Sequence, residues 1–132
     1  MPWRTLALIA AGEGAARDFT LNLAVTLSRT GMSHVGAPIL VADCTEVPLN
    51  QLNSILADIR ACCEGGERVI LALSAVAQSP TTVALAGAAD GIVLCVMLGK
   101  MLSSDAKRTI AAVGSSKIFG SVIVRPEPAA AK

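Results

Sequence analysis

The apolar residues of this chain gather into five short runs with almost no polar position inside them. These runs are Thr5–Ala11, Ile39–Ala42, Val69–Leu73, Gly91–Leu98 and Phe119–Val124. Each has the length of a β-strand, and continuous apolar strands of this kind are typical of a parallel sheet that is covered on both faces. The pattern therefore predicts a sheet of five parallel strands.

Between these runs, apolar residues recur with the spacing of a helix face. Turn and capping residues place four helices, at Ala15–Thr30, Pro48–Cys63, Ser79–Ala89 and Ser103–Val113. The first helix is expected to end near Gly31 and the second at Gly65-Gly66. Helices that alternate with strands predict an α/β fold of three layers, with the sheet in the middle.

Length and composition indicate one soluble domain. The 132 residues are expected to form a single domain over residues 1–125, followed by a flexible tail over 126–132. Hydrophobic residues make up 53% of the chain and charged residues only 16%, which excludes a disordered protein. No apolar run reaches the roughly 18 residues that a membrane-spanning helix needs, and no signal peptide is recognised. We therefore expect a cytoplasmic protein with no direct membrane insertion.

The chain offers little for binding nucleic acid or metal. Its formal net charge is +1, and it contains one Trp, two Phe and no Tyr, so neither a basic surface nor a base-stacking platform is expected. The lone His34, expected in a solvated loop, is far in sequence from the cysteines, and no Cys-x-x-Cys pair occurs. We expect no metal site and four reduced thiols, although the adjacent Cys62 and Cys63 leave a redox role open.

The turn after the first strand carries the most chemical information. It reads Gly12, Glu13 and Gly14, and it leads into Ala15, Ala16 and Arg17. The first strand-to-helix turn of an open α/β sheet commonly holds an anion at the helix N-terminus. A Walker loop also needs a Lys for the phosphates and a following Ser or Thr for Mg²⁺, and both are missing here. A simple tight turn and an anion-binding turn both stay open, and no cofactor is expected.

Other motifs follow this turn in a defined order. They are Leu21–Ala24 (LNLA), Ile39–Asp43 (ILVAD), Val69–Val76 (VILALSAV) followed by Ser79-Pro80, and Ala89–Lys100 (ADGIVLCVMLGK). Their order and spacing resemble the deviant-Walker ATPases of the Min/Par group and, more closely, the cytoplasmic kinase domains of bacterial exopolysaccharide synthesis. The resemblance covers roughly residues 5–124, and it implies a P-loop-NTPase-like sheet with the strand order 2-3-1-4-5.

Departures from that family decide the functional interpretation. Ala15 or Ala16 replaces the family's Lys, so Gly12 to Arg17 would form a vestigial phosphate loop. Asp43 and Ala72 fall on vestigial Walker positions, and Ala72 stands in place of the Walker B aspartate. Because the chain has no Tyr, the tyrosine autophosphorylation of the family is impossible.

We therefore expect no enzyme, but a non-catalytic adaptor or regulator that has lost ATP binding and hydrolysis and acts in bacterial polysaccharide synthesis or export. One alternative is a small α/β enzyme or small-ligand-binding protein that uses the crevice at the carboxyl ends of the strands. Glu13 and Asp43 would then be its acid and base. The site of that alternative would consist of Gly12, Glu13, Gly14, Asp43, Ser74 and Gly99. A further alternative is a Min/Par-like positioning regulator.

The high apolar content also predicts self-association. A domain of this size cannot bury so much apolar surface internally, and a surplus on a soluble protein usually marks an interface. We expect a homo-oligomer, most simply a two-fold dimer, or binding to a membrane-bound polysaccharide co-polymerase. The expected interface lies on the second helix and includes Leu52, Ile55, Leu56 and Ile59.

Overall fold

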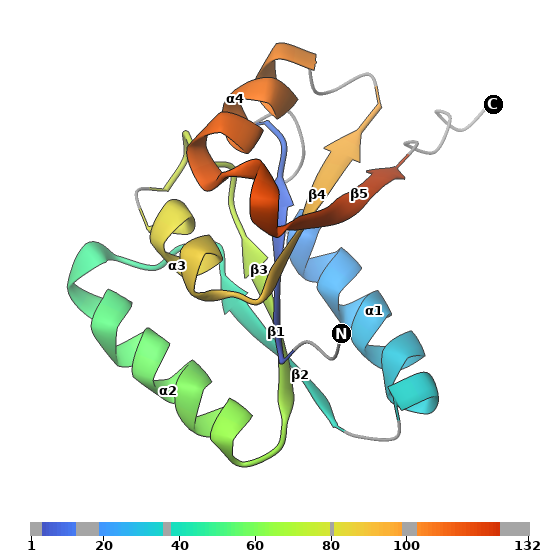
Figure 1. Ribbon diagram of the computed structural model, residues 1–132, viewed down its shortest axis with the longest axis vertical. Helices are drawn as coiled ribbons and strands as arrows, with labels where there is room; N and C mark the ends of the chain where they lie inside the picture. Colours follow the sequence, from blue (N-terminus) through green and yellow to red (C-terminus); the bar gives the residue numbers. More distant parts are fainter. Residues whose placement is uncertain (1–3, 13–18, 36–37, 80, 99–102, 125–132) are drawn as a thin grey trace, which may run out of the picture.

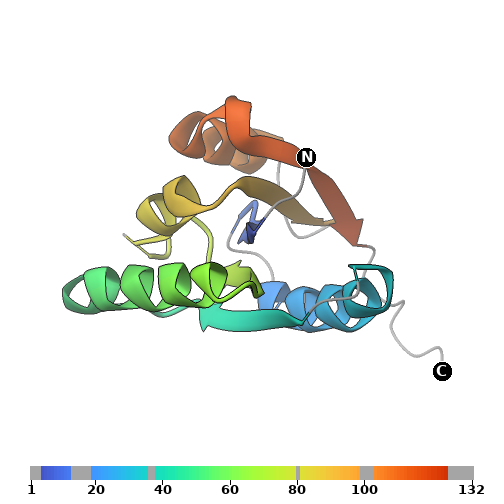
Figure 2. The same ribbon diagram turned by 60° about the horizontal axis from the view of Figure 1, so that its bottom comes forward.

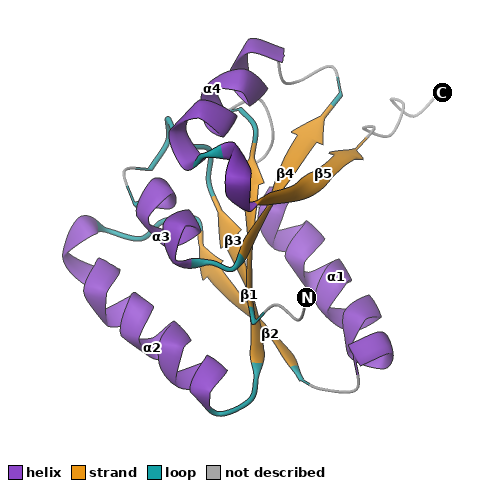
Figure 3. Cartoon of the chain, in the orientation of Figure 1, coloured by secondary structure: helices purple, strands orange, loops and turns teal. Residues whose placement is uncertain are grey.

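The computed structural model describes residues 4–12, 19–35, 38–79, 81–98 and 103–124 of the chain, and strands and helices alternate along it (Figure 1 and Figure 3). The strands are β1 (Thr5–Ala10), β2 (Ile39–Cys44), β3 (Arg68–Leu73), β4 (Gly91–Met97) and β5 (Ile118–Val124). The helices are α1 (Phe19–Val35), α2 (Leu52–Glu64), α3 (Thr82–Ala88) and α4 (Ser103–Val113), with short 3-10 turns at Leu49–Gln51 and Ser115–Lys117.

All five strands are parallel and lie in the order β2-β3-β1-β4-β5, as the sequence and its resemblance predicted. The central strand β1 is buried at all six of its positions. Its residue Leu8 lies between Ala72 of β3 and Val93 of β4. Both faces of this strand are covered, which explains why its sequence is a continuous apolar run rather than an alternating one.

The helices cover the two faces of the sheet unequally (Figure 2). On one face, α2 and α3 pack on a core that includes Leu71, Leu85 and Ile92, and α4 adds Val113 to it. On the other face, α1 is the one described helix that packs on the strands, and its residues Phe19 and Ala24 lie in the second part of the core. The fold is therefore a three-layer α/β sandwich. Within the described residues, no helix is long and apolar enough to cross a membrane.

The first helix differs from its expected length. It continues through Gly31 and ends at Val35, so His34 lies in its last turn and not in a loop. A Cβ on Gly31 would lie 2.8 Å from Cδ1 of Ile39, and the neighbouring Ser28 hydroxyl donates a hydrogen bond of 2.8 Å to the Ile39 carbonyl. Gly31 thus allows close packing of the helix on β2 instead of ending it. The expected start of this helix at Ala15 falls outside the described residues.

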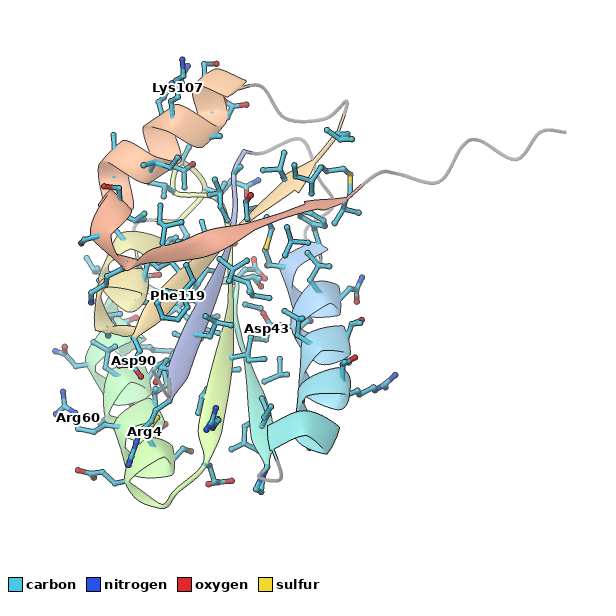
Figure 4. The ribbon with its side chains drawn as sticks, turned by 45° about the vertical axis from the view of Figure 1, so that its right-hand side comes forward. Arg4, Asp43, Arg60, Asp90, Lys107 and Phe119 are labelled. Atoms are coloured by element: carbon cyan, nitrogen blue, oxygen red, sulfur yellow. The ribbon has the colours of Figure 1, made fainter. Side chains whose placement is uncertain are left out.

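Hydrogen bonds join the turn before β4 to the amino end of β1. Oδ2 of Asp90 accepts hydrogen bonds from the backbone amides of Arg4 (2.7 Å) and Thr5 (3.1 Å), and the Asp90 amide donates to the Thr5 carbonyl (2.9 Å). Arg4, Arg60 and Asp90 gather near this end of the sheet (Figure 4). The acidic side chain therefore satisfies backbone amides that precede the first ladder bonds of the strand.

All four cysteines are free, and their environments differ. Burial, together with the charge of Asp43, raises the pKa of Cys44 to about 11, and burial raises the pKa of Cys95 to about 12. Cys62 and Cys63 are half-buried on α2.

Thiol labelling should separate the two pairs. At pH 8, iodoacetamide should alkylate Cys62 and Cys63 at least roughly 100-fold faster than Cys44 and Cys95, because the thiolate is the nucleophile and the buried thiols hold their protons. Mass spectrometry of peptides from the native protein gives the order of labelling. Unfolding in urea should make all four cysteines react alike. Fast labelling of Cys95 in the native protein would contradict its burial in the core.

Candidate functional site

A crevice of about 150 Å³ opens where the carboxyl ends of β1 and β3 meet α4. After β1 the chain passes to α1 on one face of the sheet, and after the neighbouring β3 it passes to α3 on the other face. Ligands of open α/β sheets bind at such a switch point. The crevice is lined by the strand-end residues Ala11, Gly12, Ala75, Val76 and Ala77 and by the α4 residues Asp105, Arg108 and Thr109.

Helix α4 is held against the end of β1. The buried Thr109 hydroxyl lies within hydrogen-bond distance of two carbonyl oxygens, that of Ala11 (3.1 Å) and that of Asp105 in the preceding turn (2.9 Å). This contact places the first turn of α4 directly over Gly12. A Cβ on Gly12 would lie 2.9 Å from Oδ2 of Asp105, so glycine is the residue that leaves room for the carboxylate.

The site therefore presents negative charge to the turn that would hold a phosphate. Asp105 lies beside Gly12, the first residue of the turn for which the sequence predicts a vestigial phosphate loop. A carboxylate beside a bound phosphate would oppose its negative charge. Arg108 lines the same crevice from an exposed position on α4, so the crevice carries both signs of charge.

The Walker B position of the resemblance is fully inside the sheet. Ala72 has no exposed surface, and it lies on β3 between Leu8 of β1 and Asp43 of β2. Its side chain packs in the core on the α1 face. It supplies no oxygen for a metal ion. Across the part of the chain that the structure describes, no three His, Cys, Asp or Glu side chains are close enough together to hold a metal.

Asp43, at the other Walker position implied by the resemblance, accepts hydrogen bonds from within the loop that follows β2. Its Oδ1 accepts hydrogen bonds from the amide (3.2 Å) and the hydroxyl (2.6 Å) of Thr45. The Ser74 hydroxyl donates to the Thr45 carbonyl, which ties the loop after β2 to the loop after β3. Asp43 is thus committed to a turn of the Asx type and does not line the crevice.

The structure rearranges the site that the small-enzyme alternative required. It places Gly12 in the crevice but leaves Asp43 and Ser74 out of its lining. Glu13, Gly14 and Gly99 lie outside the described residues, as do Ala15, Ala16 and Arg17. Sequence reasoning missed Asp105 and Arg108, for which the only signal was a helix start at Ser103.

The expected interface stripe on α2 faces inward. Its apolar residues are half-buried and pack on the core between α2 and the sheet: Leu52, Ile55, Leu56 and Ile59. The stripe therefore attaches the helix to the domain, and part of it borders a groove beside β2. Self-association through this surface stays a prediction.

Comparison with known proteins identifies the fold. The sequence matches no protein-family profile, and no curated protein sequence matches it either. Among solved structures, the chain is similar to a BceF tyrosine kinase domain, with a TM-score of 0.56 and 16% sequence identity. The alignment covers 95% of this chain and 69% of that domain. The chain therefore has a fold related to that of a tyrosine kinase domain.

Proposed function

We propose that this chain is a non-catalytic adaptor or regulatory protein on a degenerate P-loop fold, acting in bacterial polysaccharide synthesis or export. The observation that carries the proposal is the Asp105 carboxylate against Gly12. The similarity to a tyrosine kinase domain supports the ancestry of the scaffold. The sequence resemblance to the kinase domains of exopolysaccharide synthesis supports the biological setting.

Mg-ATP does not fit the residues that surround the crevice. Phosphoryl transfer depends almost entirely on positioning and on neutralising the charge of the phosphates. The chain has alanine where the family has its phosphate-binding Lys, and Ala72 where the family has its Walker B aspartate. Asp105 adds a negative charge beside Gly12, at the start of the loop that would hold the phosphates. The missing Lys, the missing Ser or Thr for Mg²⁺ and the missing Walker B aspartate, together with the nearby Asp105 carboxylate, support a scaffold that does not use ATP.

An adaptor needs a stable scaffold more than a reactive centre, and the fold meets that need. The five described strands form one sheet, and the hydrogen bond from the Thr109 hydroxyl to the Ala11 carbonyl joins two elements that line the crevice. Because the sequence contains no Tyr, this chain cannot be phosphorylated on tyrosine. Its role would then rest on the surfaces it presents to other proteins.

Titration calorimetry with Mg-ATP tests the proposal. The wild-type chain should show no binding heat at nucleotide concentrations up to the millimolar range, and it should release no phosphate. The Ala15→Lys variant should also lack turnover, because one added Lys restores neither the metal ligands nor the charge balance beside Asp105. Micromolar binding by the wild type, or steady hydrolysis by the variant, would show that the site is still functional.

A small-ligand-binding protein is the second candidate function, and the mixed charge of the crevice favours it. Asp105 and Arg108 could bind the two ends of a small zwitterion in a cavity of about 150 Å³. A thermal-shift screen of metabolites distinguishes the two candidates, since a specific rise in Tm of several degrees with one compound would favour this class. A gene neighbourhood of partition genes, without glycosyltransferases, would instead favour the Min/Par-like alternative.

A further inference from the structure

A second cavity lies away from the crevice, as a groove between β2 and α2. Its volume is about 280 Å³. One wall is the outermost strand, from Leu40 to Cys44, and the other is formed by Ile55, Ile59 and Cys62 of α2. The floor and walls are therefore largely apolar, although the groove is open to solvent. An open apolar groove beside an exposed strand is a common docking site for peptide segments.

Strand β2 is able to accept another strand. It lies at the edge of the sheet and pairs only with β3 among the described strands. The pairing runs without a register shift from Ile39 to Cys44, so the outer edge is regular. No Pro or Lys interrupts the strand, and Leu40 is 38% exposed. Asp43, near the carboxyl end of the strand, is the one charged residue on it, and neither a bulge nor a Pro interrupts the pairing from Ile39 to Cys44.

The opposite edge of the sheet is protected in a way that β2 is not. The pairing of β4 with β5 shifts register between Ile92 and Val93, and the extra residue on β5 is Phe119. Such a bulge twists an edge strand away from further pairing. Of the two edge strands, β2 is therefore the one whose outer edge is regular enough to pair with a further strand.

Charge around the groove indicates what it binds. Asp43 and Asp58 are the charged residues among its described lining, both are acidic and both are exposed. Two β2 strands paired antiparallel about Val41 and Ala42 would set Asp43 of each copy opposite the apolar Leu40 of the other. That arrangement would also join two acidic rims without a basic lining residue. A second copy of the chain is therefore a poor occupant, and a basic segment is a good one.

We propose that this groove binds an extended apolar segment of a partner protein that is flanked by Lys or Arg and that adds to β2 as a further strand. Backbone hydrogen bonds along β2 would give affinity, and alternate side chains would enter the groove against Ile55 and Ile59. The flanking cations would pair with Asp58 and with Oδ2 of Asp43, whose other carboxylate oxygen, Oδ1, accepts the hydrogen bonds from Thr45. This inference goes beyond the proposed function, because it holds whether or not the crevice binds a nucleotide.

Fluorescence anisotropy with designed peptides tests the proposal. One probe is a labelled peptide that alternates valine and threonine between flanking lysine pairs, and its matched control carries glutamate in place of each lysine. At low salt, the lysine-flanked peptide should bind at least about tenfold tighter than the glutamate-flanked control. Added salt should reduce this difference in affinity between the two peptides. N-methylation of alternate backbone amides should abolish binding when it blocks the edge that faces β2, and the opposite N-methyl pattern should have little effect.

Variants of the full chain assign the binding to the groove. Asp58→Asn should weaken the lysine-flanked peptide by about threefold, as expected for the loss of one exposed ion pair. Glu64→Gln is the matched control, because Glu64 is exposed on the same helix but does not line the groove. Equal binding of the two peptides, or an unchanged affinity in Asp58→Asn, would overturn the proposal. A dimer in sedimentation that Leu40→Lys dissociates would overturn it in favour of self-association. A positive result in the Mg-ATP titration would leave it untouched.

Discussion

Replacing Ala72 with aspartate should lower the free energy of unfolding by about 3–5 kcal/mol, because it places an uncompensated carboxylate inside the sheet. Ala72 has no exposed surface, and its neighbours across the ladder are Leu8 and Asp43. Asp43 would add repulsion. Urea denaturation at pH 7 measures the change. An aspartate at the position that the resemblance assigns to Walker B should therefore cause a large loss of stability.

The pH dependence of that variant gives an independent check. Burial raises the pKa of a carboxyl group, so the folded variant would keep a proton that the unfolded chain loses above about pH 4. The loss of stability should therefore grow as pH rises from about 4 and shrink below it. Ala57→Asp is the control, since Ala57 is exposed on α2 and the change should cost less than about 1 kcal/mol. A cost below about 1 kcal/mol for Ala72→Asp would mean that the position opens to solvent.

Gly91→Ala should lower the free energy of unfolding by about 2 kcal/mol, because the new Cβ would overlap the ring of Phe119. Phe119 belongs to the neighbouring strand β5, and the nearest atom of its ring lies 2.3 Å from the position that a Cβ on Gly91 would occupy. Since Phe119 is half exposed, its ring can be removed at modest cost, and Phe119→Ala should recover most of the loss caused by Gly91→Ala. Thermal or urea unfolding of the two single variants and the double variant gives the coupling energy.

A second glycine provides the contrast. Gly87 in α3 has no atom within 4 Å of the position that a Cβ would occupy. Gly87→Ala should therefore be neutral or stabilise the protein by up to about 1 kcal/mol, as a gain in helix propensity. If the two alanine variants behave alike, or if Phe119→Ala fails to rescue Gly91→Ala, the packing of Phe119 on Gly91 does not contribute as described.

The strands were predictable from the sequence because burial on both faces leaves a direct trace in it. Thr5–Ala11 is apolar throughout, as a central parallel strand must be, and β1 occupies nearly all of that run. Helix α4 was placed at its observed bounds from its capping residues and apolar spacing. The strand order needed the family resemblance, since apolar runs state which segments are strands but not which are neighbours.

Local signals failed where tertiary contacts decide the outcome. Gly31 resembles a helix stop in sequence, but the helix continues through it, and a Cβ there would require the end of the Ile39 side chain to shift. The crevice depends on α4, and the hydrogen bond that sets its wall joins Thr109 to Ala11 across 98 positions of sequence. No local pattern marks such a pair. The position of the Asp105 carboxylate beside Gly12 therefore could not be predicted from the sequence.

The place of β1 in the sheet has a consequence for synthesis of the protein. β1 leaves the ribosome before both of its neighbours in the sheet, since Thr5 pairs with Val69 and Leu6 pairs with Gly91, both far later in the chain. Loop closure over such distances makes folding slow, and β1 stays an exposed apolar segment until β3 and β4 have emerged. We therefore expect the nascent chain to need chaperones until β3 and β4 have been synthesised. Once complete, the central strand should be the last to exchange its amide protons.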